Sequence, residues 1–208
     1  MRPQAFTNVR VVDPASGWDG PGAVLVRDGV IADVAQGGGL GSLSEDVEVV
    51  DGGGALLLPG LVDLRVKTGE PGAETKETLK SAALAAAAGG VTSIVLQPDT
   101  DPVVDEPSVA DFILRRARDI HLVHVYPAGA ATKGARGERM AEIGLMAEAG
   151  CVYITDADRP IVDSKVMRRV LAYAAGFGMQ VAHRPADPWL VAGAAASEGE
   201  FAARLDNA

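Results

Sequence analysis

Two cations at the end of an apolar run are the first residues of this sequence whose type and spacing suggest chemistry. The run LPGLVDLRVKTGEPG, residues 58–72, places Arg65 and Lys67 two positions apart. Alternate side chains of a β-strand point to the same face, so both cations are expected to project together. Most charges at such ends are ordinary solvated loop residues. Two aligned cations nevertheless make this strand end a candidate site.

Apolar, β-branched runs recur at nearly constant intervals from residue 61 onward. They begin at Leu61, Val91, His121, Cys151 and Gln180. Between them we expect helices over residues 74–88, 107–118, 138–149 and 163–175. Repeated β-α units of this length predict parallel strands joined by right-handed crossovers.

The expected helices carry recognisable end signals. Asp163 is a plausible N-cap, because its carboxylate accepts hydrogen bonds from the first free N–H groups of a helix. Gly89, Gly150 and Gly176 follow three of the segments, where a left-handed residue is expected to end a helix.

Two α/β architectures are built from such units: an open doubly wound sheet and a closed (β/α)8 TIM barrel. No G-x-G-x-x-G motif opens the first helix, which weakens the dinucleotide-binding form. About five units are present, whereas a closed barrel needs eight. A barrel would therefore be incomplete in this chain, and the residues alone leave both architectures open.

The first 57 residues differ from the rest. They contain short β-rich runs separated by turn formers such as Asp28-Gly29, which predict hairpins in a small β module. We therefore expect two domains, a β module over residues 1–57 and the β-α units over residues 58–208. The longest apolar run, residues 82–88, is too short to cross a bilayer, and no signal peptide is recognisable.

Composition narrows the range of partners and compartments. The net charge of −9 argues against nucleic acid and against an anionic membrane surface as partners. The single cysteine excludes an internal disulfide and suits a reducing cytoplasm, so a cytoplasmic protein is expected. Cys151 lies in the apolar run GCVYI and is expected to be a buried core residue and not a nucleophile.

In either architecture ligands bind at the carboxyl ends of the parallel strands. Polar and charged residues gather at these ends, and together they form the candidate site. They are Arg65, Lys67, Gln97, Asp99, Asp101, Asp156, Asp158, His183 and Arg184.

The histidines do not predict a zinc site. Zinc needs several His, Cys or carboxylate ligands close together. His121 and His124 are three positions apart in an expected strand, so they would face opposite sides, and His183 stands alone.

The remaining charged residues form two opposed sets. They are the carboxylates Asp99, Asp156 and Asp158 and the cations Arg65, Lys67 and Arg184. The carboxylates would suit a hard cation, but the fixed positive charges would repel it. We expect the two sets to pair, so that the cations neutralise the carboxylates in place of a metal and Arg65→Ala destabilises the fold. An anion held by the same cations is the alternative, which the sequence leaves open.

Several segments resemble one known family. LLLPGLVDLRVKTGEPG is similar to the signature of dihydroorotases in the amidohydrolase superfamily, where the strand reads D-L-H-x-H-L-R-E-P-G. AAAAGGVTSIVLQPDTDPVVDEP is similar to the A-A-x-G-G-x-T-x-x-x-x-M-P-N-T-x-P segment, and GMQVAHRPADP resembles the region of a later metal-binding histidine. The resemblance implies a β-sandwich-like module followed by about the first five units of an amidohydrolase-type TIM barrel.

The resemblance does not extend to the residues that bind zinc and substrate in the family. The two histidines of D-L-H-x-H bind zinc in the family, and these positions are Arg65 and Lys67 here. The family's substrate-binding arginine and asparagine correspond to Gly69 and Asp99. The later zinc-binding histidine corresponds to Arg184.

Only Asp156, which matches the aspartate of the family's S-D-D-G segment, keeps a metal-binding residue type. A guanidinium does not coordinate a metal, and without zinc the Lewis acid and the activated water are lost. We therefore expect no catalytic residue, no metal ligand unless it is Asp156, and no zinc cofactor, although active family members use zinc.

The resemblance accordingly implies a pseudoenzyme. Dihydroorotase-like chains that lack the metal site are non-catalytic partners of aspartate transcarbamoylase, and some bacteria need them to assemble the active complex. We expect an oligomeric structural subunit of pyrimidine biosynthesis whose partner is the aspartate transcarbamoylase catalytic chain.

Two alternatives stay open. The first is an active amidohydrolase that hydrolyses the C–N bond of a cyclic amide with an altered metal site made by Asp99, Asp156 and Asp158. The second is metal-free chemistry in which Lys67, with a depressed pKa, forms a Schiff base.

Overall fold

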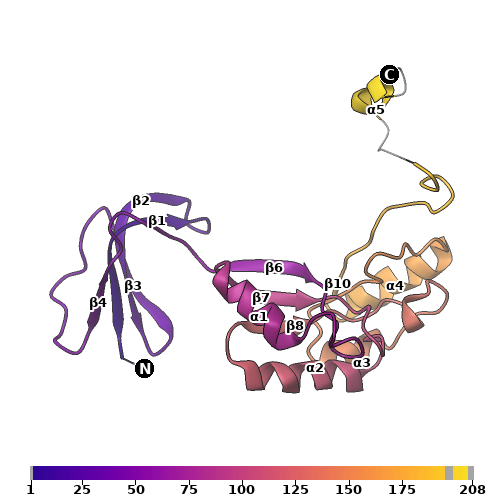
Figure 1. Cartoon of the computed structure of the whole chain (residues 1–208), viewed down its shortest axis with the longest axis horizontal. Helices are drawn as coiled ribbons and strands as arrows, with labels where there is room; N and C mark the ends of the chain where they lie inside the picture. The colour runs from indigo at the N-terminus through magenta and orange to yellow at the C-terminus, as the bar shows by residue number, and fades with distance from the viewer. Residues whose placement is uncertain (1, 195–198, 206–208) are drawn as a thin grey trace. The chain divides into compact units, whose positions relative to one another are not determined.

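The computed structural model describes residues 2–194 and 199–205, and the chain divides into two compact units, Met1–Gly60 and Leu61–Ala208. Each unit has a hydrophobic cluster of its own. The first unit contains only strands, and the second alternates strands with helices (Figure 1).

The first unit is one mixed sheet. Its strands are β1 Gln4–Asp13, β2 Trp18–Arg27, β3 Val30–Gln36, β4 Glu48–Asp51 and β5 Leu56–Leu57. The order is β3-β2-β1-β4, with β5 also paired to β1. The pairs β1–β2 and β2–β3 are antiparallel, whereas β4 and β5 run parallel to β1.

The predicted hairpins are present in this sheet. Asp28 and Gly29, which join β2 to β3, have φ angles of 50° and 76°. Positive φ at both central residues is typical of the two-residue turn whose twist matches that of the flanking strands. Val9, Val11 and Val24 form the small buried cluster of this unit.

The second unit follows the β-α rhythm of the sequence. Its elements are β6 Leu61–Val66, α1 Leu79–Ala88, β7 Val91–Leu96, α2 Pro107–Ile120, β8 His124–Pro127, a 3-10 turn at Lys133–Ala135, α3 Ile143–Glu148, β9 Tyr153–Ile154, α4 Ser164–Gly176, β10 Gln180–Val181 and α5 Glu200–Leu205. Strands β6, β7 and β8 form one parallel sheet, and β9 and β10 form another.

The two sheets are joined by backbone hydrogen bonds. Gly129, just after β8, donates to the carbonyl of Tyr153 at 3.0 Å and accepts from the amide of Thr155 at 2.9 Å. All five strands therefore follow one another in chain order, as in the first part of a barrel. The expected α/β fold with an incomplete (β/α)8 barrel agrees with this topology.

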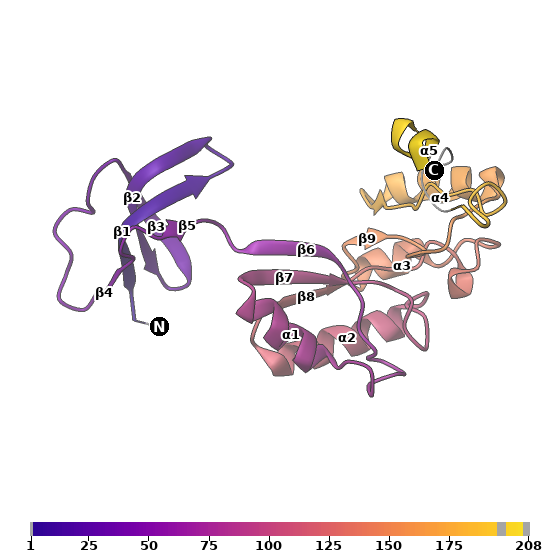
Figure 2. The ribbon, with the colours of Figure 1, turned by 45° about the horizontal axis from the view of Figure 1, so that its top comes forward.

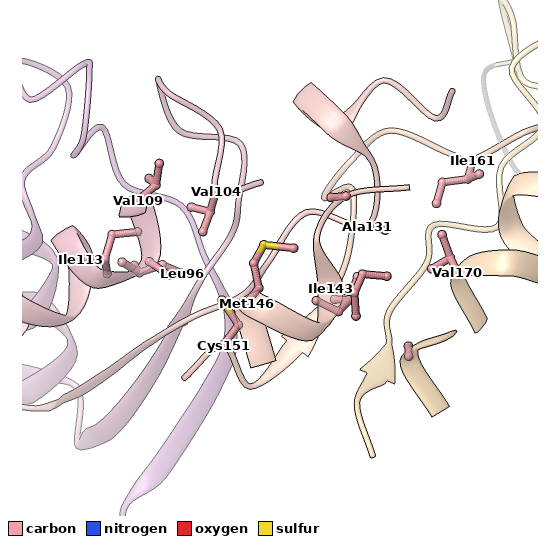
Figure 3. Packing of buried hydrophobic residues seen from close by; sticks show 14 of the residues in the cluster. Leu96, Val104, Val109, Ile113, Ala131, Ile143, Met146, Cys151, Ile161 and Val170 are labelled. Carbon is pink, nitrogen blue, oxygen red and sulfur yellow. The ribbon is translucent and has the colours of Figure 1, made fainter. Parts of the chain in front are cut away.

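Helices α1 and α2 cover the same face of the three-stranded sheet (Figure 2), where α1 packs on β7 and α2 on β8. Figure 3 shows how side chains of α2, α3 and α4 meet those of the strands and loops in one core. Cys151 belongs to this core, as predicted, and burial raises the pKa of its thiol to about 12. A thiol with this pKa stays protonated near neutral pH and is a poor nucleophile.

Two predicted helices are shorter than expected. Helix α1 begins at Leu79 and not at residue 74, because the side chain of Thr78 accepts a hydrogen bond from the amide of Ser81 and caps the helix there. Helix α3 covers only Ile143–Glu148 of the predicted residues 138–149. The carbonyl of Arg139 accepts a hydrogen bond from the amide of Lys133 at 2.8 Å, so the residues before α3 pair with a loop and not with a helical turn.

The other predicted helix ends agree with the structure only in part. Asp163 caps α4 as predicted, since its carboxylate accepts from the amides of Lys165 at 2.8 Å and Val166 at 3.3 Å. Gly150 has a φ of 97°, as expected. After α1, however, Gly90 and not Gly89 takes the left-handed conformation, with a φ of 76°.

Two further predictions were wrong. Gly176 is the last residue of α4, and the left-handed residue after that helix is Gly178, with a φ of 66°. His121 does not lie in a strand: it ends α2 with a φ of 51°, and β8 begins only at His124. Among the described residues, no helix is long and apolar enough to cross a membrane.

Candidate functional site

The carboxyl ends of the strands surround a cavity of about 510 Å³. Its lining comes from β6, from the residue after β7, from β9 and the loop after it, and from the loop after β10. It includes Arg65, Gln97, Tyr153, Asp158, His183 and Arg184. The structure thus brings together many of the polar residues that the sequence placed at the strand ends.

Asp158 is the centre of an ion-pair cluster at this cavity. Its carboxylate accepts hydrogen bonds from the guanidinium of Arg65 and the ammonium of Lys67, and it lies 3.8 Å from Nη1 of Arg184. The ammonium of Lys67 also donates to Asp99 Oδ2 at 2.5 Å. Each of the three predicted cations therefore faces a carboxylate, as expected.

The same contacts shift the pKa values of Asp158 and Lys67 in opposite directions. The hydrogen bond from Lys67 holds the pKa of the Asp158 carboxyl below its usual range. The hydrogen bonds to Asp158 and Asp99 raise the pKa of the Lys67 ammonium. A protonated ammonium is not a nucleophile, so the Schiff-base alternative lacks the depressed pKa on which it depends.

The cluster is open to solvent, which argues against the expectation that Arg65→Ala noticeably destabilises the fold. The side chain of Asp158 is 44% exposed, that of Asp99 is 36% exposed, and that of Arg65 is 56% exposed. Water and salt screen charges in such positions, so each ion pair contributes little to folding.

We therefore expect Arg65→Ala to lower the free energy of unfolding by less than about 1 kcal/mol, since exposed ion pairs contribute no more than this. Urea denaturation followed by circular dichroism measures the change. Arg168→Ala, which removes an exposed arginine of α4, is the matched control. A loss of several kcal/mol with Arg65→Ala alone would show that the cluster supports the fold after all.

Asp156 does not join the cluster, and its predicted pairing with the cations was wrong. Its side chain accepts hydrogen bonds from the amide of Thr132 at 2.9 Å and from the hydroxyl of the same residue. The Thr132 hydroxyl in turn accepts from the amide of Gly137 at 2.8 Å. Asp156 is buried, and this burial raises the pKa of its carboxyl. Its contacts thus hold the loop after β8.

A hydrogen-bonded bridge that sequence reasoning missed crosses the strand ends. The hydroxyl of Tyr153 on β9 donates to the carbonyl of Leu64 on β6 and accepts from Nε2 of Gln97 at 2.6 Å. Gln97 directly follows β7, so the bridge ties three strands together. Alternation within the run CVYIT puts Tyr153 on one face of a strand, but nothing in the local sequence indicates its partners.

Glu70 is a second group that sequence reasoning missed. It is 3% exposed, and its carboxylate accepts from the amide of Leu79 at 2.9 Å and from Nε of Arg116 at 2.7 Å. Leu79 is the first residue of α1, where free N–H groups and the helix dipole favour a negative charge. Glu70 therefore fixes the segment after β6 against α1 and α2.

Gly69 lies in the loop between β6 and α1, at a point where the backbone of this loop is hydrogen-bonded to itself. Its amide donates to the carbonyl of Glu77 at 2.9 Å, and its carbonyl accepts from the amide of Ala73 at 2.5 Å. A Cβ atom at this position would lie 1.9 Å from the carbonyl oxygen of Ala73. Only glycine fits this backbone, so the position that corresponds to the family's substrate-binding arginine has no room for a side chain.

The residues at the strand ends do not fit a zinc ion. Asp99 and Asp158 are both hydrogen-bonded to the ammonium of Lys67, and Asp156 is hydrogen-bonded to Thr132. Over residues 2–194 and 199–205, no group of three or more His, Cys, Asp or Glu side chains is arranged to hold a metal ion. The fixed charges of Arg65 and Lys67 oppose a divalent cation at this place.

Comparison with known proteins shows where the chain belongs. The family model described as dihydro-orotase-like matches residues 54–207. A protein named dihydroorotase from Geobacter sp. (strain M21) is 40% identical over 196 residues, which is 94% of this chain and 45% of that protein. Another of the same name from Pelobacter propionicus is 42% identical over 192 residues, covering 92% of this chain and 45% of the relative.

Solved structures agree on the fold. L-hydantoinase (dihydropyrimidinase) from Arthrobacter aurescens is similar with a TM-score of 0.69 and 20% sequence identity, over 87% of this chain and 40% of that one. A D-hydantoinase has a TM-score of 0.68 at 19% identity, over 86% and 39% of the two chains. The chain spans less than half the length of these relatives. It belongs to the dihydroorotase-like family of the amidohydrolase superfamily.

Proposed function

We propose that this dihydroorotase-like chain is catalytically inactive and serves pyrimidine biosynthesis in the cytoplasm as a structural subunit that helps to assemble aspartate transcarbamoylase. One observation supports the first part of this proposal, the catalytic inactivity. The positions that correspond to three zinc-binding histidines of the family hold Arg65, Lys67 and Arg184, and all three face the carboxylate of Asp158. A salt-bridged cluster thus lies where the family places its metal.

The chemistry of the family explains why this exchange matters. Zinc supplies a Lewis acid and lowers the pKa of a bound water, and no guanidinium or ammonium replaces these functions. Substrate binding is affected as well, because Gly69 has no room for a side chain and Asp99 is hydrogen-bonded to Lys67. A carboxylate in place of the family's asparagine would also repel an anionic substrate.

Inactivity is tested on the whole natural polypeptide, purified beside a zinc-containing dihydroorotase as control. We expect well under one zinc ion per chain by elemental analysis, also after incubation with zinc salts. We also expect no hydrolysis of dihydroorotate above the uncatalysed rate. Stoichiometric zinc together with turnover would overturn this part of the proposal.

The assembly role is tested by affinity purification of the tagged polypeptide from its own cells. We expect the aspartate transcarbamoylase catalytic chain to co-purify. In reconstitution, we expect transcarbamoylase activity to depend on the added polypeptide. A transcarbamoylase that assembles and works fully without it would refute the structural role, whatever the zinc content.

An active amidohydrolase with an altered metal site is the second candidate. The observation that favours it is the identity of about 40% to proteins named dihydroorotase. It requires Asp99, Asp156 and Asp158 to exchange their present hydrogen bonds for a metal ion. The zinc and turnover measurements above decide between the two candidates.

A further inference from the structure

The cavity at the strand ends has the size of a small-molecule site. Its volume of about 510 Å³ lies within the range of ligand pockets, roughly 300–1,000 Å³. Arg65 and Arg184 line it from β6 and from the loop after β10, and His183 lies next to Arg184. Asp158 is the one carboxylate among its lining residues.

The charges at this cavity are not balanced. The single carboxylate of Asp158 faces Arg65, Arg184 and also Lys67. Asp99 balances only Lys67, and Asp156, which is hydrogen-bonded to Thr132, interacts electrostatically with His183 of the lining. The two arginines of the lining therefore share one negative charge, and Lys67 competes for it.

Arg184 has the fewest partners of the three cations. The Oδ1 atom of Asp158 accepts from Arg65 and the Oδ2 atom from Lys67, so Arg184 approaches no nearer than 3.8 Å. This separation is too long for a hydrogen bond. Within the described residues the Arg184 side chain makes no hydrogen bond, and it is 57% exposed. Its planar fork of N–H donors matches a carboxylate or a phosphate group.

Uncharged polar groups complete the lining. Gln97 uses Nε2 to donate to Tyr153, which leaves its carbonyl oxygen as an acceptor at the cavity. The Thr155 oxygen accepts from the amide of Ala157 at 3.1 Å, and its O–H remains a donor. A ligand with a charged end and a polar body would find partners for both.

We propose that this cavity binds a small organic anion whose carboxylate or phosphate group is held by Arg184 and Arg65, with Asp158 as the internal anion that competes with it. This inference does not rest on the role in assembly proposed above. It concerns a site formed by the residues that correspond to the family's metal-binding positions. These side chains are positively charged here and would bind a negatively charged group.

The test is isothermal titration calorimetry on the whole natural polypeptide. The probes are inorganic phosphate and malonate, each at an ionic strength held constant with sodium chloride. We expect saturable binding of one probe per chain, and the tighter probe identifies the preferred group. Arg184→Gln should weaken binding at least about tenfold, since it removes charge-assisted hydrogen bonds.

Asp158→Asn provides the second measurement and should strengthen binding, because Arg65 and Arg184 lose the carboxylate that competes with the ligand. A purely structural role for the cluster predicts the opposite or no effect. Arg168→Gln is the control: it removes an exposed arginine of α4 near Lys165 and Arg169, away from the cavity lining. We expect it to leave the affinity unchanged.

Several results would overturn the inference. The first is the absence of saturable binding with both probes. The second is an affinity of Arg184→Gln equal to that of the natural chain. The third is a loss of affinity with Arg168→Gln as large as that with Arg184→Gln, which would indicate general attraction to positive charge. Melting curves establish that each variant is folded. If Arg184→Gln does not fold, Arg184→Lys replaces it in the test, because it keeps the positive charge but loses the planar guanidinium. Bound zinc with turnover would refute inactivity, whereas lost binding without zinc would refute this inference only.

Discussion

Gly69→Ala is expected to lower the free energy of unfolding by about 3 kcal/mol, the upper part of the range for overpacked sites. The added Cβ would lie 1.9 Å from the carbonyl oxygen of Ala73 and 2.9 Å from that of Glu77. Because both contacts are to backbone, the loop must open. It would then lose the hydrogen bonds that Gly69 makes with these two residues. Urea denaturation followed by circular dichroism measures the loss.

Gly176→Ala is the matched control for this prediction. A Cβ at Gly176 meets no atom within 4 Å, and the residue ends helix α4. Alanine in a helix is favoured over glycine by about 0.5–1 kcal/mol, so this variant should be as stable as the natural chain or more stable. Equal stability of Gly69→Ala and Gly176→Ala would contradict the closed loop.

The closed loop also bears on the proposed inactivity. Returning the family's arginine at position 69 would meet the same backbone atoms as alanine does. If the proposed inactivity is correct, histidines at positions 65 and 67 alone would therefore not suffice for substrate binding. The cations at positions 65 and 67 and the glycine at position 69 are two separate departures from the sequence pattern that this chain resembles.

Glu70→Ala is expected to lower the free energy of unfolding by about 2–3 kcal/mol, somewhat less than is typical for a broken buried ion pair. The variant removes an acceptor from the first amide of α1 and leaves Arg116 without its carboxylate. The estimate is reduced because the Arg116 side chain is 50% exposed and can be hydrated. Denaturant unfolding again gives the measurement.

Two variants make this result specific. Glu70→Gln keeps an oxygen for the amide of Leu79 but removes the charge, so it should show an intermediate loss. Glu138→Ala removes an exposed glutamate of the same unit and should stay within about 0.5 kcal/mol of the natural chain. A loss with Glu138→Ala as large as that with Glu70→Ala would mean that the effect is not due to this contact.

The sequence by itself determined the features that depend on local pattern. The spacing of the apolar runs predicted parallel strands alternating with helices, because each β-α unit must bury one face of its strand and helix in turn. The Asp28-Gly29 turn and the Asp163 cap were also readable, since both arise from contacts within a few residues. The same pattern placed Arg65 and Asp158 at one end of the sheet.

Only the tertiary structure decided which of these groups meet. Asp156 and Asp158 are two positions apart, yet one is buried against Thr132 and the other faces three cations. Local sequence offers no signal for this difference, because the partners lie 24 to 93 residues away. The same holds for Glu70, whose partner Arg116 is 46 residues distant.

Backbone contacts account for the remaining differences between the predicted and the observed structure. The first turn of the predicted helix at residues 138–149 is absent, since Arg139 pairs with Lys133 across a loop. Gly69 is required by the carbonyl of Ala73, which the sequence does not place beside it. Periodicity thus predicts the elements and the end of the sheet at which a site forms. The partners of each charge follow only from the way the chain closes on itself, because electrostatic and steric contacts act through space and not along the sequence.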